Sequence, residues 1–257
     1  MPLNGTELAG QDTVVVGGTG NVGSFLVDGF VRAGARVLVP SRSQHKLDRL
    51  LTRLGPDKAR HVVPLTGDIG SAAGAAALQT EVRELTEHLH AVAAAPAGWH
   101  QTSSMLKAGF DDFRSVIEHS LFPHYLAAQT FLPLLEPNGS YTSINGPVGF
   151  IGPPQSGVGP MAVVSVAQNK LMQAFAMETA GAPRVNDVVM KAFLDPRGTR
   201  PGSPLTGEQV GDFIGALASP AGKLVHNQTL HLHDPRQVDA ALTGVFEGLD
   251  DTAEHGL

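Results

Sequence analysis

The segment VVVGGTGNVGSFL, residues 14–26, decides how the rest of the chain is interpreted. An apolar run rich in β-branched residues is followed at once by a glycine-rich turn and then by a helical pattern. The glycines satisfy both GxGxxG, counted from Gly18, and GxxGxxG, counted from Gly17. Glycine lets the backbone approach a pyrophosphate, while amide groups at the helix N-terminus receive its charge. A purely structural turn is the alternative. The pattern predicts a dinucleotide or mononucleotide site formed by Gly17, Thr19, Gly20, Asn21, Val22 and Gly23.

The next predicted strand ends in VLVPSRS, residues 37–43, where NAD-binding proteins hold an acid for the ribose 2′-hydroxyl. Ser41 and Arg42 replace that acid with groups suited to a 2′-phosphate, so NADP(H) is the expected cofactor. An ordinary solvated arginine is the alternative. Asp68, after the third strand, is expected to accept a hydrogen bond from the adenine, and it is equally compatible with a helix N-cap. Ile69 and Ala95 complete the predicted cofactor contacts.

Short apolar runs alternate with helical patterns along the chain, which predicts an α/β fold: a single-domain, Rossmann-type, doubly wound parallel sheet of about seven strands with helices on both faces. The expected strands lie at 13–18, 35–40, 61–68, 90–95, 139–145, 184–190 and 228–233. The expected helices lie at 21–33, 44–54, 72–89, 113–135, 161–180 and 208–218.

Two segments fall outside this alternation within the expected single domain of residues 1–257, whose core spans 11–233. Residues 194–207 are rich in glycine and proline and predict a long loop that covers the substrate. The C-terminal tail, 234–257, contains an amphipathic pattern at about 238–249 that is expected to cap the site or a partner subunit.

Composition limits the possible functions. The chain has 257 residues, a formal net charge of −6 and no cysteine, which excludes disulfides and thiolate chemistry. It has no long basic run, so small molecules or proteins are expected as partners rather than nucleic acid or a membrane. No histidine or acid pair has metal-ligand spacing, so no metal site is predicted. The N-terminus has no leader pattern and no apolar run reaches the roughly 20 residues that cross a bilayer, so a cytoplasmic protein is expected.

Four segments carry a family resemblance: GGTGNVG (17–23), PAG (96–98), RVND (184–187) and GEQVGDFIGALASPAGKLVHNQTLHL (207–232). On these segments the chain resembles the short-chain dehydrogenase/reductase family from Val14 to about His233. The resemblance implies NAD(P) bound at the carboxyl edge of the sheet. It also implies a homodimer or homotetramer that packs through two long helices.

The catalytic positions depart from this resemblance. The family keeps an asparagine in its fourth helix, a serine after its fifth strand, and a tyrosine with a lysine four residues later. When AFAMET (174–179) is aligned with the family's ALALE, these positions match Ser120, Gly146, Met161 and Ser165. The chain is therefore expected to be an atypical member without the Ser-Tyr-Lys residues.

A second register, which uses Lys170 as the lysine, places Val166 at the tyrosine position. Neither register supplies the tyrosine. The two tyrosines of the chain, Tyr125 and Tyr141, have no lysine four residues later.

The glycine motif for the cofactor is kept, whereas the tyrosine and lysine that transfer the proton in the family are absent. This combination predicts a ketoreductase-like NADP(H)-dependent oxidoreductase. A phenol or enol next to a ketone can pass a proton to the ketone oxygen, so phenolic, quinone and polyketide-type carbonyls are the expected substrates. Asn145 and Ser143 are candidate catalytic hydrogen-bond donors, and Lys191 is a candidate amine near the nicotinamide. Ordinary strand-end and surface roles are their alternatives. Ser165 is expected to contact the nicotinamide ribose.

Trp99 and His100 follow the fourth predicted strand, in a loop that is expected to face the substrate. Histidine can donate a proton near neutral pH, although a surface role is the alternative for His100. Two other functions stay open: a non-catalytic NADP-binding sensor or partner subunit, and non-redox chemistry such as cyclisation or dehydration.

Overall fold

The computed structural model describes residues 3–102, 104–195 and 198–246. Its main sheet has seven strands in the order β3-β2-β1-β4-β5-β6-β9, and each neighbouring pair is parallel. This order confirms the predicted Rossmann-type, doubly wound fold. The strands are β1 (Asp12–Val16), β2 (Arg36–Ser41), β3 (Val62–Thr66), β4 (Leu89–Ala94), β5 (Leu135–Asn145), β6 (Arg184–Met190) and β9 (Thr229–Leu232).

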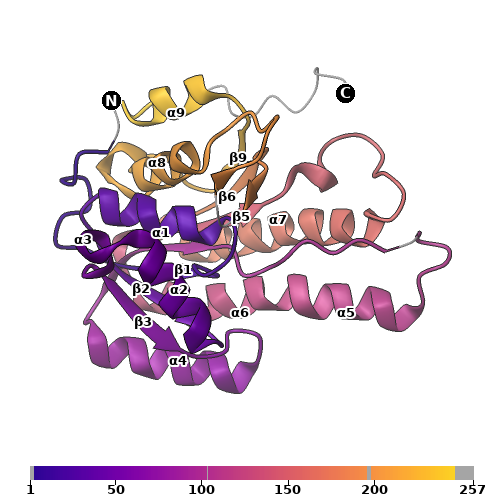
Figure 1. The fold of residues 1–257 in the computed structure, drawn as a ribbon, viewed down its shortest axis with the longest axis horizontal. Coiled ribbons are helices and arrows are strands. Elements are labelled where there is room, and N and C mark those ends of the chain that lie inside the picture. Colours follow the sequence, from indigo (N-terminus) through magenta and orange to yellow (C-terminus); the bar gives the residue numbers. More distant parts are fainter. Residues whose placement is uncertain (1–2, 103, 196–197, 247–257) are drawn as a thin grey trace.

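Helices cover both faces of the sheet (Figure 1). Helices α1 (Gly23–Arg32), α2 (Gln44–Leu54) and α8 (Gly207–Ala218) contribute to one apolar cluster. Helices α4 (Ala72–Leu85), α6 (Phe122–Phe131) and α7 (Gly159–Thr179) contribute to the other. Short helices connect these elements: α3 (Pro56–Ala59), α5 (Phe110–Ser120), α9 (Pro235–Ala241) and the 3-10 turns η1 (Leu132–Leu134), η2 (Pro147–Gly149) and η3 (Pro220–Gly222).

Successive side chains of a strand point to opposite faces of the sheet, and this alternation produces the two apolar clusters. In β1, Val14 and Val16 pack into the cluster with α4, α6 and α7, whereas Val15 between them packs into the opposite one. The sheet is therefore buried on both faces, as the near-continuous apolar strands predict. Side chains also fix helix starts: Ser43 accepts a hydrogen bond from the Lys46 amide at the N-terminus of α2.

The helix expected at 113–135 is two helices, α5 and α6, separated at Leu121. Pro123 lies in the first turn of α6, where its missing N–H is tolerated because the first amides of a helix have no intrahelical partner. Asp68 is not the N-cap of α4. That position belongs to Ser71, whose side chain accepts a hydrogen bond from the Gly74 amide.

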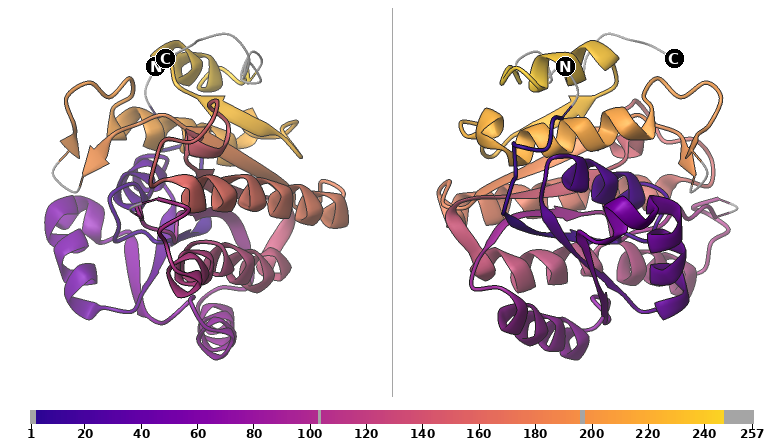
Figure 2. Two further views of the ribbon diagram at one scale, coloured as in Figure 1. Left: turned by 90° about the vertical axis from the view of Figure 1, so that its right-hand side faces the viewer. Right: turned by 60° about the vertical axis from the view of Figure 1, so that its left-hand side comes forward.

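The segment 194–207, expected to be irregular, contains two short antiparallel strands, β7 (Leu194–Asp195) and β8 (Gly198–Thr199). Figure 2 shows this hairpin apart from the main sheet. In the tail, α9 ends at Ala241 and packs against α8, with Val238 and Ala241 buried. The predicted tail helix at 238–249 therefore ends early, and its last residues, from 247 on, lie outside the described residues.

The topology determines where a site can form. Strands β1 and β4 are neighbours although the chain leaves β1 toward β2, so the strand order reverses between them. Ligands of open α/β sheets bind beyond the carboxyl ends of the strands at such a switch point. The segments after β4 and β5 lie on that side, together with parts of α5 and α7 that extend past the sheet (Figure 1).

Candidate active site

The glycine turn, residues 17–23, joins β1 to α1 and is built by close backbone contacts. Gly17 has a φ of 76°, and a Cβ added to it would overlap the carbonyl oxygen of Ala95. A Cβ on Gly23 would overlap the carbonyl oxygen of Gly17. Gly20, in contrast, is exposed, and a Cβ added to it would make a tight contact of 3.1 Å with the Gly17 carbonyl oxygen rather than an overlap. The turn is therefore tight on its inner side and open on its outer side, where a phosphate group fits.

The other predicted residues of the turn occupy this outer side. Thr19 and Val22 are half-buried and Asn21 is exposed, all immediately before the first turn of α1. The amides of Ser24, Phe25 and Leu26 in the first turn of α1 donate to the carbonyls of Gly20 and Val22, and the helix dipole is positive at that end. The geometry fits the phosphates of a nucleotide.

Three further predicted cofactor residues meet beside the turn. The Thr19 and Ser41 hydroxyl oxygens are 3.4 Å apart. Arg42 is 76% exposed, and its Nε is 3.8 Å from Asp68 Oδ1. Asp68 also accepts from the Gly70 amide at 3.0 Å, which holds the loop before α4. The guanidinium thus stays accessible at the end of β2.

Ile69 and Ala95 lie at the ends of the third and fourth strands. Ile69 packs against the apolar cluster under α4, and the Ala95 amide donates to the Val16 carbonyl at 2.9 Å. Ala95 therefore connects the end of β4 to the glycine turn.

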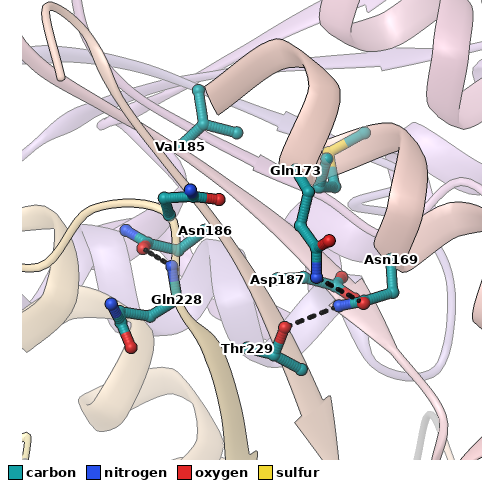
Figure 3. A pocket seen from close by; sticks show the side chains of 9 residues that line it. Asn169, Gln173, Val185, Asn186, Asp187, Gln228 and Thr229 are labelled. Atoms are coloured by element: carbon teal, nitrogen blue, oxygen red, sulfur yellow. Dashed lines mark hydrogen bonds between the residues drawn. The ribbon is translucent and has the colours of Figure 1, made fainter. Parts of the chain in front are cut away.

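A buried polar network occupies the space between α7 and the strands β5 and β6. We call it the Asp187 network; its members are His124, Ser143, Asn145, Ser165, Gln168, Asn169, Asp187 and Thr229. Asp187 is in the middle of β6 and is 2% exposed. Three neutral amides donate to its carboxyl group: Asn145 at 2.9 Å, Asn169 at 3.0 Å and Gln168 at 3.3 Å. Figure 3 shows Asn169 joined by dashed lines to Gln173 and Thr229, with Asp187 beside them.

Two titratable groups of this network have shifted pKa values. Burial raises the pKa of Asp187 to about 6, against the opposing effect of the amide hydrogen bonds. Burial lowers the pKa of His124 to about 3, so its imidazole is neutral at pH 7. His124 Nδ1 is 3.2 Å from Ser143 Oγ, which also accepts from Gln168 at 2.8 Å.

Asn145 joins the network to the end of β5. Its amide nitrogen donates to the Ser165 carbonyl and to Asp187, both at 2.9 Å. Its carbonyl oxygen accepts from the Gly146 amide and from the Ser165 hydroxyl. Both amide hydrogens are therefore used within the protein, so direct donation to a substrate would require one of these bonds to break.

The first two turns of α7 contain Met161 and Ser165. Met161 Sδ is 3.9 Å from Ser120 Oγ, and the Ser165 hydroxyl donates to the Gly146 carbonyl at 2.8 Å. These contacts bring together the four positions of the first register. In the second register, Lys170 is exposed, and its amine donates to Gln173 on the outer side of α7.

Neither tyrosine lies at the start of α7. Tyr141 is in β5 and fully buried, and this burial raises the pKa of its phenol. Tyr125 is on α6, 42% exposed, with its ring against Phe175. Beyond β5, a Cβ on Gly146 would meet nothing within 4 Å, so there is open space at this strand end.

Lys191 follows β6 directly and is exposed; its amide donates to the Leu232 carbonyl at 2.8 Å. The structure thus places Asn145 and Ser143 together in the Asp187 network and leaves Lys191 outside it. Sequence reasoning missed five members: His124, Gln168, Asn169, Asp187 and Thr229. One signal was available, because an aspartate interrupts the apolar strand RVNDVVM.

A metal site and a membrane-spanning helix are two further features that would bear on function. In the part of the chain that the structure describes, no group of three or more histidines and acids is placed to hold a metal ion. No helix among the described residues is long and apolar enough to span a bilayer.

Comparison with known proteins places the chain beside one family of enzymes. The family model of short chain dehydrogenases matches residues 11–183. The rhamnolipids biosynthesis 3-oxoacyl-[acyl-carrier-protein] reductase of Pseudomonas aeruginosa is 24% identical over 235 residues, covering 91% of this chain and 81% of the relative.

Solved structures share the fold. A dehydrogenase/reductase from Sinorhizobium meliloti 1021 has a TM-score of 0.78 at 18% identity, covering 90% of this chain and 96% of that one. A short-chain dehydrogenase/reductase from Serratia marcescens has a TM-score of 0.78 at 16% identity, covering 88% and 97%. The Pseudomonas aeruginosa RhlG/NADP active-site complex has a TM-score of 0.75 at 20% identity, covering 90% and 98%.

Proposed function

The chain belongs to the short-chain dehydrogenase family, and from this premise we propose that it is an NADP(H)-dependent oxidoreductase that reduces a hydrophobic carbonyl compound without the family tyrosine. The observation that carries the proposal is the glycine turn. Its inner side excludes any Cβ at Gly17 and Gly23, while its outer side opens beside the switch point of the sheet. Such a turn serves the close approach of a phosphate.

NADP(H) is the proposed cofactor because of the residues around the turn. Gly20, Asn21 and Val22 would face the pyrophosphate, and Arg42 would pair with the 2′-phosphate. Asp68 would face the adenine. Support also comes from the Pseudomonas aeruginosa neighbour, whose structure is an NADP complex. When bound, the reduced cofactor supplies a hydride to the carbonyl carbon.

A hydrophobic substrate is proposed because exposed apolar side chains follow three neighbouring strands. They lie after β4, β5 and β6, and parallel strands end at the same edge of a sheet. Exposed apolar residues in such a cluster mark binding surfaces. The residues are Trp99, Met105, Leu106, Ile151 and Phe193.

The proposed mechanism dispenses with the tyrosine. Met161 and Ser165, in the first two turns of α7, have no acidic proton to give. General acid catalysis contributes about 10²–10⁴-fold, whereas orientation contributes about 7–11 kcal/mol, so a well-positioned substrate can still react. A phenolic, quinone or polyketide-type carbonyl compound fits best, because a neighbouring hydroxyl supplies part of the proton transfer.

The three candidate catalytic residues take different parts in this proposal. Asn145 and Ser143 hold the end of β5 at the proposed substrate edge, and Ser165 keeps that end against α7. Ser165 would also face the nicotinamide ribose. Lys191, exposed at the end of β6, would place a positive charge near the developing alkoxide. The segment 194–207, whose described residues include the paired strands β7 and β8, would cover the substrate.

We also propose a homo-oligomer. Exposed apolar side chains gather on the outer sides of α6 and α7, where a second copy would bury them. They are Phe122, Tyr125, Val163, Val166 and Met177.

Cofactor titration tests the proposal. We expect NADPH to bind more tightly than NADH by cofactor fluorescence, and Arg42→Ala to weaken NADPH about tenfold or more while NADH is unchanged. Adding quinones and phenolic ketones to the NADPH complex should then oxidise it.

Each contrary outcome identifies an alternative. Tight NADPH binding without oxidation of any panel member favours a sensor or a partner subunit. No binding of either cofactor contradicts the proposed function and leaves non-redox chemistry on the same fold.

A further inference from the structure

Carbonyl reduction needs a proton, and neither Met161 nor Ser165 in α7 supplies one. A donor would therefore have to come from the loops beyond the strand ends. One loop contains an imidazole beside a carboxylate: His100 Nε2 is 3.3 Å from Asp112 Oδ1. The two side chains are 43% and 41% exposed, so both are reached by solvent and by a ligand.

The loop that carries His100 spans the mouth of the site. At its start, Ala95 is bonded to the end of β1 and touches the glycine turn. At residue 102, it is fixed to the segment before α7, because the Thr102 amide donates to the Gly157 carbonyl at 2.8 Å and the Thr102 hydroxyl donates to it at 3.2 Å. A Cβ on Gly157 would overlap the Thr102 carbonyl, so this attachment is close. His100 is thus held between the cofactor turn and the start of α7.

The partner of His100 is also held in place. Asp112 lies in the first turn of α5, where the helix dipole favours a negative charge. A carboxylate facing Nε2 stabilises the tautomer with hydrogen on that nitrogen. Nδ1 is then the nitrogen that exchanges a proton with a ligand.

We propose that His100 is the general acid of the reduction and that Asp112 is its positioning residue, an inference that rests on the proposed function. The hydride and its electron pair go to the carbonyl carbon, and the carbon–oxygen π electrons move to the oxygen. The His100 imidazolium gives its Nδ1 proton to that oxygen, which forms the alcohol. Neutral His100 then regains a proton from water.

The test uses steady-state kinetics of the full chain with NADPH and the best ketone of the panel. His100→Ala should lower kcat about 100-fold, the lower end of general acid catalysis, with NADPH affinity unchanged. Because the side chain is exposed, added imidazole should enter the space that His100→Ala leaves and raise the kcat of the variant at least tenfold. Asp112→Asn should lower kcat about tenfold and leave KM unchanged.

The matched control is His119→Ala, which removes an exposed histidine of α5 whose Nδ1 is 2.8 Å from the Ser115 carbonyl of its own helix. It should leave kcat within about twofold. Two results would overturn the inference and leave the proposed function intact. One is a His100→Ala variant with the same kcat as the wild type, and the other is a loss of kcat in His100→Ala that imidazole does not restore. If the wild-type chain reduces nothing in the panel, the inference fails together with the proposed function.

Discussion

The glycine turn and the Asp187 network lie at two parts of one sheet and are specified in opposite ways. The turn depends on the absence of side chains: carbonyl oxygens of Ala95 and Gly17 occupy the places of two Cβ atoms. The network depends on the presence of polar side chains, with amides, hydroxyls, an imidazole and a carboxylate packed around β5, β6 and α7.

This difference determines how each part responds to change. A backbone contact cannot adjust to an added atom, so the turn should fail as a whole. Hydrogen-bonded side chains lose one bond at a time, at about 1–3 kcal/mol for each buried group left without a partner. Titratable members of the network add a dependence on pH that the turn lacks.

The sharpest test of the turn is Gly23→Ala. The added methyl group would overlap the Gly17 carbonyl, so the turn must open. We expect a loss of more than ~4 kcal/mol in the free energy of unfolding and no measurable NADPH binding. Denaturant unfolding and cofactor fluorescence measure both. Gly98→Ala is the control, since its Cβ would meet nothing within 4 Å; equal behaviour of the two variants would contradict the backbone argument.

Within the network, His124→Gln should change the pH dependence of stability most. The pKa of His124 is lowered from 6.5 to about 3, so below pH 6.5 the unfolded state binds a proton that the folded state does not. Wild-type stability should therefore fall as the pH drops from 7.5 to 4.5, by about 3 kcal/mol more than that of the variant. Urea unfolding of both proteins at the two pH values gives this difference, and parallel pH curves would show that His124 is not held neutral.

Asp187→Asn should shift the pH dependence in the opposite direction. The pKa of Asp187 is raised from 3.8 to about 6, so between these values the folded state binds a proton that the unfolded state does not. Relative to the variant, wild-type stability should rise by about 2 kcal/mol as the pH drops from 7.5 to 4.5. Thermal unfolding at both pH values measures it. A change of the same sign as for His124 would contradict the raised pKa.

The same contrast explains what the sequence could predict. The glycine turn is local, since strand, turn and helix follow one another between Asp12 and Arg32, and the pattern was visible. The parallel sheet with helices on both faces follows from the alternation of strands and helices along the chain. The order of the strands was not predicted and comes from the structure. The break at Leu121 was missed although Pro123 signals a new helix start.

The Asp187 network could not be predicted, because its members come together only in the folded chain. Gln168 and Asn169 lie on α7 at positions where a core helix usually has apolar residues, and Asp187 comes from a strand 18 residues after Asn169. Asn145 and Ser143 were chosen for their polarity at a strand end, but their hydrogen-bond partners depend on the register between β5, β6 and α7.

The smallest effect separates satisfied from unsatisfied hydroxyls in the same sheet. The Thr229 hydroxyl accepts from Asn169 at 2.8 Å, so Thr229→Val should cost about 1 kcal/mol because a buried amide loses an acceptor. The Thr142 hydroxyl in β5 is buried and has no hydrogen-bond partner among the described residues, so Thr142→Val should be neutral or stabilising by up to about 1 kcal/mol. Urea unfolding at pH 7.5 compares the two variants. The substitution is identical at the two positions. An equal loss in the free energy of unfolding would mean that the hydrogen bond to Asn169 adds nothing to the stability of the network. A loss at Thr229 with a gain at Thr142 would establish that individual hydrogen bonds hold the network.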